Sequence, residues 1–123
     1  MEIHHVALRT RDVDALARFY VDVVGLAEIP NAGGDSVWLR AGRAVVMLER
    51  AAPGEPGPAA AGMDLVAFAT TEEDKRALAA RLARGGVAVE GETAHTLYFR
   101  DPDGRRVGAS TYPLPTRDTV EGG

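Results

Sequence analysis

Two short apolar segments, 3–9 and 63–69, carry the dipeptide Val-Ala at corresponding positions, sixty residues apart. Both segments are rich in strand-forming residues, and each is followed by a polar break. A run with helical spacing of apolar residues then begins, at 12–24 in one case and at 71–84 in the other. Similarity at a fixed separation indicates a structural unit used more than once. The chain therefore predicts two copies of a unit that starts with a strand and continues with a helix.

The first copy has clear signals for the ends of its helix. Asp12 is a typical N-cap residue, and Gly25 stands where helices commonly end in left-handed backbone. Apolar runs after the helix predict three strands, and Ala41-Gly42 predicts a tight turn between the last two. We expect these strands at 26–30, 36–40 and 43–50, and the buried stripe of the helix at Leu16, Phe19, Tyr20, Val23 and Val24.

The segment 51–62 contains three prolines and three glycines, so it predicts a linker without regular structure. The second copy then repeats the order of the first, with a tight turn expected at 101–104 and a loose tail at 113–123. Its strands are expected at 63–70, 87–92, 95–100 and 105–112, and its helix at 71–84. The sequence therefore predicts one α+β domain made of two tandem βαβββ modules, 3–50 and 63–112.

Composition excludes several classes of protein. The 123 residues suffice for one domain, and 46% hydrophobic residues indicate a globular chain. A net charge of −4 argues against nucleic-acid binding, and the absence of cysteine excludes disulfides and thiolate chemistry. No apolar run is long enough to span a membrane, and the start of the chain lacks the features of a signal peptide. We therefore expect a cytoplasmic protein without membrane or nucleic-acid partners.

The chain resembles the vicinal oxygen chelate superfamily, which includes glyoxalase I, bleomycin resistance proteins, epimerases, fosfomycin resistance enzymes and extradiol dioxygenases. The resemblance rests on three stretches in this order: His5-Val-Ala-Leu, Phe19-Tyr20 with Gly25-Leu26, and Tyr98-Phe-Arg-Asp-Pro-Asp-Gly104. It implies a curved, open sheet that forms a cleft, with the helices on the outside. It also implies a small-molecule ligand or substrate and a homodimer.

In the metal-using members of this family, four positions in the cleft hold a divalent ion such as zinc, nickel, manganese or iron. The first position falls on His5, and the second falls on Met47 or, two residues later, on Glu49. The third falls on Leu65 and the fourth on Gly108, neither of which can bind a metal through its side chain. Because at most His5 and Glu49 could be ligands, we expect no metal cofactor. The same two residues are the candidates for acid/base catalysis.

Strand alternation places further candidates in the cleft. Trp38 could stack on a planar ligand or belong to the core, and Met47 could contact a ligand or simply fill space. The arginines could bind a carboxylate or phosphate, or be solvated, and His95 could act as an acid or base or lie on the surface. The predicted cleft residues are Ala7, Arg9, Trp38, Arg40, Met47, Leu65, His95, Arg106, Gly108 and Tyr112.

Three functions are compatible with these residues. The first is a metal-free binding protein, similar to bleomycin resistance proteins, that sequesters a small metabolite or antibiotic. The second is a glyoxalase-, epimerase- or dioxygenase-like enzyme that uses a reduced metal site or acid/base catalysis by His5 and Glu49. The third is a partner-binding module whose cleft is vestigial. The loss of two metal-ligand positions favours the first function.

Overall fold

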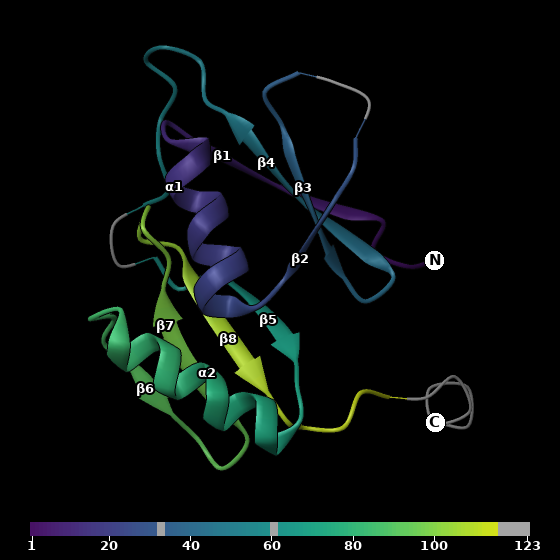
Figure 1. Ribbon diagram of the computed structural model, residues 1–123, viewed down its shortest axis with the longest axis vertical. Coiled ribbons are helices and arrows are strands. Elements are labelled where there is room, and N and C mark those ends of the chain that lie inside the picture. The colour runs from purple at the N-terminus through teal and green to yellow at the C-terminus, as the bar shows by residue number, and fades with distance from the viewer. Residues whose placement is uncertain (32–33, 60–61, 116–123) are drawn as a thin grey trace.

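The computed structural model describes residues 1–31, 34–59 and 62–115, and within them the predicted order of elements repeats (Figure 1). The first module contains β1 (His5–Thr10), α1 (Val13–Arg18), the π-helical segment η1 (Phe19–Val24), β2 (Ala27–Ile29), β3 (Val37–Ala41) and β4 (Ala44–Arg50). The second module contains β5 (Leu65–Ala69), α2 (Glu72–Arg84), β6 (Gly91–Glu92), β7 (Thr96–Arg100) and β8 (Arg106–Ser110).

Each module forms one four-stranded mixed sheet. The strand orders are β1-β4-β3-β2 and β5-β8-β7-β6, so the two sheets have the same topology. In each, the first and last strands of the module run parallel, and the other neighbours are antiparallel. The predicted α+β fold with two βαβββ modules is therefore confirmed. β1 and β5 each have a neighbour on one side only, so they are edge strands.

The predicted helix ends are largely correct. The Asp12 side chain accepts a hydrogen bond from the Ala15 N–H at 3.0 Å, and the Thr71 hydroxyl accepts one from the Asp74 N–H at 3.1 Å. Gly25 ends the first helical stretch with φ of 98°, a left-handed conformation that favours glycine. No helix in the part of the chain that the structure describes is long and apolar enough to cross a membrane.

Three local features differ from the prediction. The first helix widens into π-type hydrogen bonding over its last six residues, where the Arg81 Nε from the second module donates to the Val23 carbonyl at 2.7 Å. The turn between β3 and β4 is Gly42-Arg43, because Ala41 is still paired with Ala44. β6 has only two residues. Residues 51–59 form no helix or strand, as expected, whereas 116–123 lie outside the described residues.

One hydrophobic core joins the two modules. It lies on the helix-facing sides of both sheets, and the first helix contributes to both halves of it. Phe19 packs against Phe99 of the second sheet with ring centroids 6.1 Å apart. The core residues with the smallest exposed fraction are Leu16, Tyr20, Leu39, Leu48, Leu82, Phe99 and Val107. Burial of these side chains is the main stabilising contribution to the fold.

A buried carboxylate, that of Asp101, connects the first helix to the second sheet. The Tyr20 hydroxyl donates to its Oδ2 at 2.8 Å, and Arg105 Nη1 donates to the same oxygen at 3.2 Å. Its Oδ1 accepts the backbone N–H groups of Asp103 and Arg105 at 2.9 and 3.0 Å, which fixes the turn. Arg105 also donates to the carbonyl of Arg9 on β1. Burial, and then the charge of Asp101, raise the pKa of Tyr20, so its phenol remains a neutral donor.

We predict that Asp101→Asn lowers the free energy of unfolding by about 2–4 kcal/mol, because it removes a charged acceptor from four donors at a side chain that is 0% exposed. Urea denaturation followed by circular dichroism measures this change. Asp103→Asn is the matched control: its carboxylate is partly exposed and, among the described residues, pairs only with Arg105, so the loss should be below about 1 kcal/mol. Equal losses for the two variants would contradict the role assigned to Asp101.

Candidate functional site

The face of each sheet that is turned away from the helices is open. Along β1, the exposed residues His5, Ala7 and Arg9 alternate with less exposed residues that face the core. Within each sheet, the strand register shows which residues of the neighbouring strands lie on the same face. It includes ten of the predicted site residues: His5, Ala7, Arg9, Trp38, Arg40, Met47, Glu49, Leu65, Arg106 and Gly108. We call these surfaces the first and second open faces.

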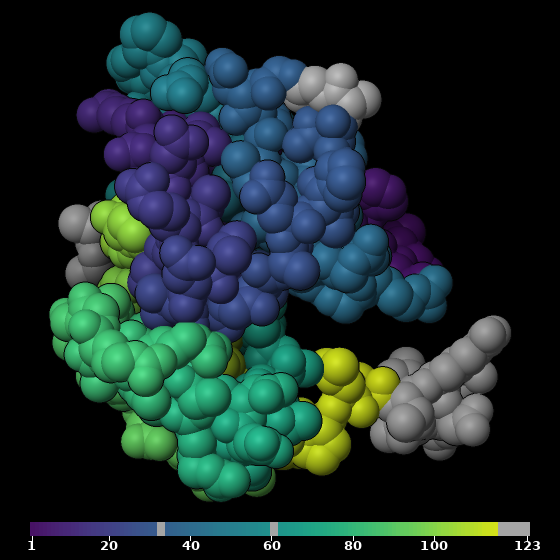
Figure 2. All heavy atoms as spheres, in the orientation of Figure 1, coloured from purple at the N-terminus to yellow at the C-terminus, as the bar shows by residue number. Residues whose placement is uncertain are grey.

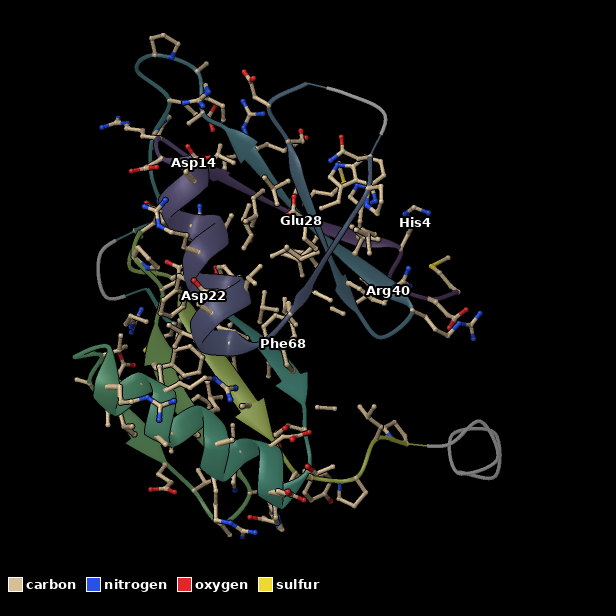
Figure 3. The ribbon with its side chains drawn as sticks, in the orientation of Figure 1. His4, Asp14, Asp22, Glu28, Arg40 and Phe68 are labelled. Carbon is tan, nitrogen blue, oxygen red and sulfur yellow. The ribbon has the colours of Figure 1, made fainter. Side chains whose placement is uncertain are left out.

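The first open face has an apolar row across its middle. Ala7 pairs with Met47, Met47 with Trp38, and Trp38 with Ile29. The indole Nε1 of Trp38 is buried and has no hydrogen-bond partner in the structure. Arg40 is exposed towards the end of the sheet where the chain begins, as Figure 3 shows together with His4. Trp38 is therefore not a core residue under the helices, which was the alternative prediction.

The second open face differs from the first in its middle row, where glycine takes the place of methionine. Leu65 pairs with Arg106, and Ala67 pairs with Gly108 in the next row. Tyr98 follows Gly108 in that row, in the place that Trp38 takes beside Met47. The matching registers make the modules directly comparable: Leu65 corresponds to His5, and Gly108 corresponds to Met47.

This correspondence bears on the second family ligand position, which the sequence leaves between two residues. The resemblance assigns the fourth position to Gly108, and the residue that corresponds to Gly108 in the first module is Met47. Glu49 instead corresponds to Ser110, one row further along. The four positions are then occupied by one imidazole, one thioether, one isobutyl group and one glycine.

These residues do not fit a divalent metal ion. Zinc, nickel, manganese and iron bind imidazole, carboxylate or thiolate groups in proteins, and only His5 supplies one. In the described ranges 1–31, 34–59 and 62–115, no three His, Cys, Asp or Glu side chains come close enough to hold an ion. The His5 Nδ1 lies 2.9 Å from the Nδ1 of its neighbour His4, which makes a hydrogen bond between the two rings.

The space beside Gly108 is also closed to a side chain. A Cβ added there would lie 3.3 Å from the Ala67 Cβ and 3.4 Å from both the Leu65 Cδ1 and the Thr96 Cγ2. The first of these distances is tighter than an ordinary van der Waals contact between carbon atoms, and the other two are at its lower limit. Aliphatic groups therefore fill the region where the resemblance implies a carboxylate ligand.

Arg9 forms ion pairs with Glu49 on the neighbouring strand and with Glu55 in the linker. The Arg9 Nη2 donates to Glu55 at 2.7 Å and its Nε at 3.1 Å, and Arg9 also lies 3.7 Å from Glu49. The hydrogen bonds from Arg9 lower the pKa of Glu55 to about 2. Because Glu49 is level with Arg9, four residues beyond His5, the two proposed catalytic residues are about 13 Å apart along the sheet.

Arg106 is part of a cluster that the sequence only partly indicated. Its guanidinium carbon lies 4.1 Å from the centroid of the Tyr98 ring, a cation–π arrangement. Glu90 accepts a hydrogen bond from the Arg106 Nε at 3.1 Å, and it also pairs with Arg100. Hydrogen bonds from Arg100 and then Arg106 lower the pKa of Glu90. Strand alternation places Tyr98 and Arg100, and likewise Arg106 and Gly108, on one face, so it could have predicted that Tyr98, Arg100 and Arg106 lie together. Glu90 precedes a very short strand, so no pattern in the sequence predicted its position.

Two predicted site residues, His95 and Tyr112, lie beyond the ends of β7 and β8, so neither belongs to the rows of the open faces. Their rings pack edge to face with centroids 5.3 Å apart. The His95 carbonyl accepts hydrogen bonds from Lys75 Nζ and from Thr111. Alternation alone extended the strands too far, because the chain leaves the sheet after Ser110.

Two cavities lie at the second module. One, of about 310 Å³, lies where Leu65, Arg106 and Arg100 meet the end of the linker. The other, of about 470 Å³, lies on the helix side of the second sheet, between η1 and α2. Neither is lined by a side chain of the first open face, so neither unites the two faces in one cleft.

Comparisons with known proteins support the fold. A family model described as the Glyoxalase/Bleomycin resistance protein/Dioxygenase superfamily matches residues 2–108. The fosfomycin resistance protein FosX from Mesorhizobium loti has a TM-score of 0.73 at 18% identity, with 93% of each chain covered. Lactoylglutathione lyase from Agrobacterium tumefaciens has a TM-score of 0.65 at 27% identity, with 89% of this chain and 92% of that chain covered. No curated protein matches the sequence.

We predict that Gly108→Ala lowers the free energy of unfolding by about 1 kcal/mol. The crowding described above, typically 1–3 kcal/mol for an overpacked position, exceeds the roughly 0.5–1 kcal/mol that alanine gains over glycine in a strand. Chemical denaturation measures the change. Gly57→Ala is the control, since nothing lies within 4 Å of the added Cβ. An increase in stability for Gly108→Ala would show that the region beside Gly108 is open.

Proposed function

Because the chain belongs to the Glyoxalase/Bleomycin resistance protein/Dioxygenase superfamily, we propose that it binds a small metabolite or antibiotic at its open faces and sequesters it without a metal ion. The bleomycin resistance proteins in the family name are the model for this function. The name of a structural neighbour, a fosfomycin resistance protein, supports an antibiotic as one class of ligand.

The observation that carries the proposal is the buried indole N–H of Trp38, which has no acceptor among the residues that the structure describes. A buried polar group without a partner costs about 1–3 kcal/mol, so such groups are rare in folded proteins. A ligand whose binding moves the side chains that cover this N–H, and which places an acceptor atom there, would remove this cost. Met47 and Ile29, which flank Trp38 in its row, offer apolar contact to the body of the same ligand.

The guanidinium of Arg106 supports the inference that the ligand carries an anionic group. Of its donors, only Nε has a partner in the described part of the chain, so both Nη groups are available. Stacking on Tyr98 and the hydrogen bond to Glu90 hold the guanidinium in one orientation. A fixed guanidinium binds carboxylate or phosphonate groups by two parallel hydrogen bonds. The proposed ligand is therefore partly planar and carries a negative charge.

Sequestration agrees better with the geometry than acid/base catalysis does. A separation of about 13 Å prevents His5 and Glu49 from acting on one carbon atom, and the carboxylate of Glu49 faces Arg9. An enzyme remains the second candidate because His5 is exposed on the open face and a structural neighbour is a lyase by name. This candidate requires that His5→Ala abolish a measurable activity.

Neither described cavity joins the first and second open faces of one chain. This supports a dimer in which a second copy completes the cleft. Edge strands with unpaired backbone groups readily accept another strand or chain. Large apolar side chains are exposed just before both edge strands, with Ile3 71% and Met63 66% exposed. We therefore propose that a second copy covers β1 and β5.

Binding can be measured through Trp38, because it is the single tryptophan of the chain. We predict that at least one probe among metal-free bleomycin A2, fosfomycin and a panel of aromatic carboxylic acids shifts or quenches its emission. By calorimetry, Trp38→Phe should weaken that probe about threefold to tenfold through loss of one hydrogen bond, whereas Arg43→Gln in the exposed turn should not. No response to any probe, or one metal ion per chain in elemental analysis of protein purified without chelator, would contradict the proposal.

For the dimer, we predict a mass of twice 13.0 kDa in size-exclusion chromatography with light scattering. Ile3→Lys places a charge at the proposed interface and should shift the protein towards the monomer while circular dichroism remains unchanged. Leu114→Lys, in an exposed segment after β8, is the control and should leave the dimer intact. A monomer at every concentration would overturn this part of the proposal.

A further inference from the structure

The cavity of about 470 Å³ between η1 and α2 is a second candidate site, which touches the second open face only at Ala69 and Gly108. Its walls come from both modules and are about equally polar and apolar, with the apolar residues Val21, Val24 and Leu26 in the first module and Phe68 and Leu78 in the second. Phe68 alternates with Ala67 along β5, so the cavity lies on the helix side of the second sheet. Figure 2 shows the surface hollowed between the first helix and α2. Its size is typical of pockets for small ligands.

One cationic group is fixed at the wall of this cavity. Arg81 donates from Nε to the Val23 carbonyl at 2.7 Å and from Nη2 to the Val24 carbonyl at 3.4 Å. These bonds hold the guanidinium at the end of η1, and its Nη1 has no partner in the described residues. The charge of Arg81 is also unpaired there, whereas Arg9, Arg100, Arg105 and Arg106 all form ion pairs.

Two carboxylates line the same cavity, Asp22 from the first module and Asp74 from the second. Neither side chain forms an ion pair or a hydrogen bond within the described part of the chain. Figure 3 shows Asp22 on the last turns of the first helix and Phe68 on β5 below it. The cavity thus combines one fixed guanidinium, two free carboxylates and several apolar side chains.

We propose that this cavity binds the zwitterion of an apolar α-amino acid. The ligand carboxylate bonds to Arg81, the ammonium group lies between Asp22 and Asp74, and the side chain contacts Phe68 and Leu78. A simple anion is disfavoured by the two carboxylates, and a simple cation leaves the guanidinium without a counter-charge. Because the walls come from both modules, the bound ligand stabilises the junction between them.

Calorimetry with three probes tests this assignment. L-Leucine carries both charges, L-leucinamide lacks the carboxylate, and 4-methylpentanoate lacks the ammonium group. We expect L-leucine to bind and both analogues to bind at least about tenfold more weakly, since each loses charge-assisted hydrogen bonds. The emission of Trp38 should remain unchanged on binding, because Trp38 lies on the first open face. The outcome of this test is therefore independent of whether a ligand binds at the open faces.

Substitution of the two cavity carboxylates tests whether L-leucine binds in this cavity. Asp22→Asn and Asp74→Asn should each weaken L-leucine about tenfold, and Asp14→Asn, an exposed residue of α1 outside the cavity, should not change the affinity. Arg81 is left intact because it also holds η1, and L-leucinamide tests its role instead. Three results would overturn the proposal: no binding of L-leucine at millimolar concentration, equal affinity for L-leucinamide, or unchanged affinity in both Asn variants.

Discussion

The structure depends on a buried carboxylate that is shared by the two halves of the chain. Asp101 directly follows β7, fixes the turn into β8 and accepts a hydrogen bond from the Tyr20 hydroxyl of the first helix. Through Arg105 the same group reaches the backbone of β1. Neither module buries its helix-facing sheet surface alone, since Phe19 of one packs on Phe99 of the other. The hydrogen bonds of Asp101 therefore set the relative position of modules that apolar contact alone would leave less defined.

Much of the architecture follows from local patterns in the sequence. Alternation and caps predicted the elements of both modules, because each element depends on residues close in the chain. Alternation also grouped the residues of each strand by face, but it left Trp38 open between the cleft and the core. The features that were missed depend on distant residues. The widened end of the first helix coincides with the contact from Arg81, and the partners of Arg9 and Arg106 come from the linker and from the loop before β6. Strand ends were overextended at His95 and Tyr112, where alternation continues but pairing stops.

The core and the proposed open-face site use opposite surfaces of the same sheets. The core residues lie on the helix side, whereas the four positions that the resemblance assigns to metal ligands lie on the open side, at His5, Met47, Leu65 and Gly108. The side chains at these positions are therefore not constrained by packing in the core. Beside Gly108 the nearest groups are aliphatic.

Lys75, the only lysine among the 123 residues, is covered by its surroundings: it is 9% exposed, and its ammonium group bonds to the His95 carbonyl. The ammonium group of Lys75 is therefore poorly accessible to amine-directed reagents while the protein is folded. An increase in labelling of this single lysine reports the loss of the contact between α2 and the start of β7.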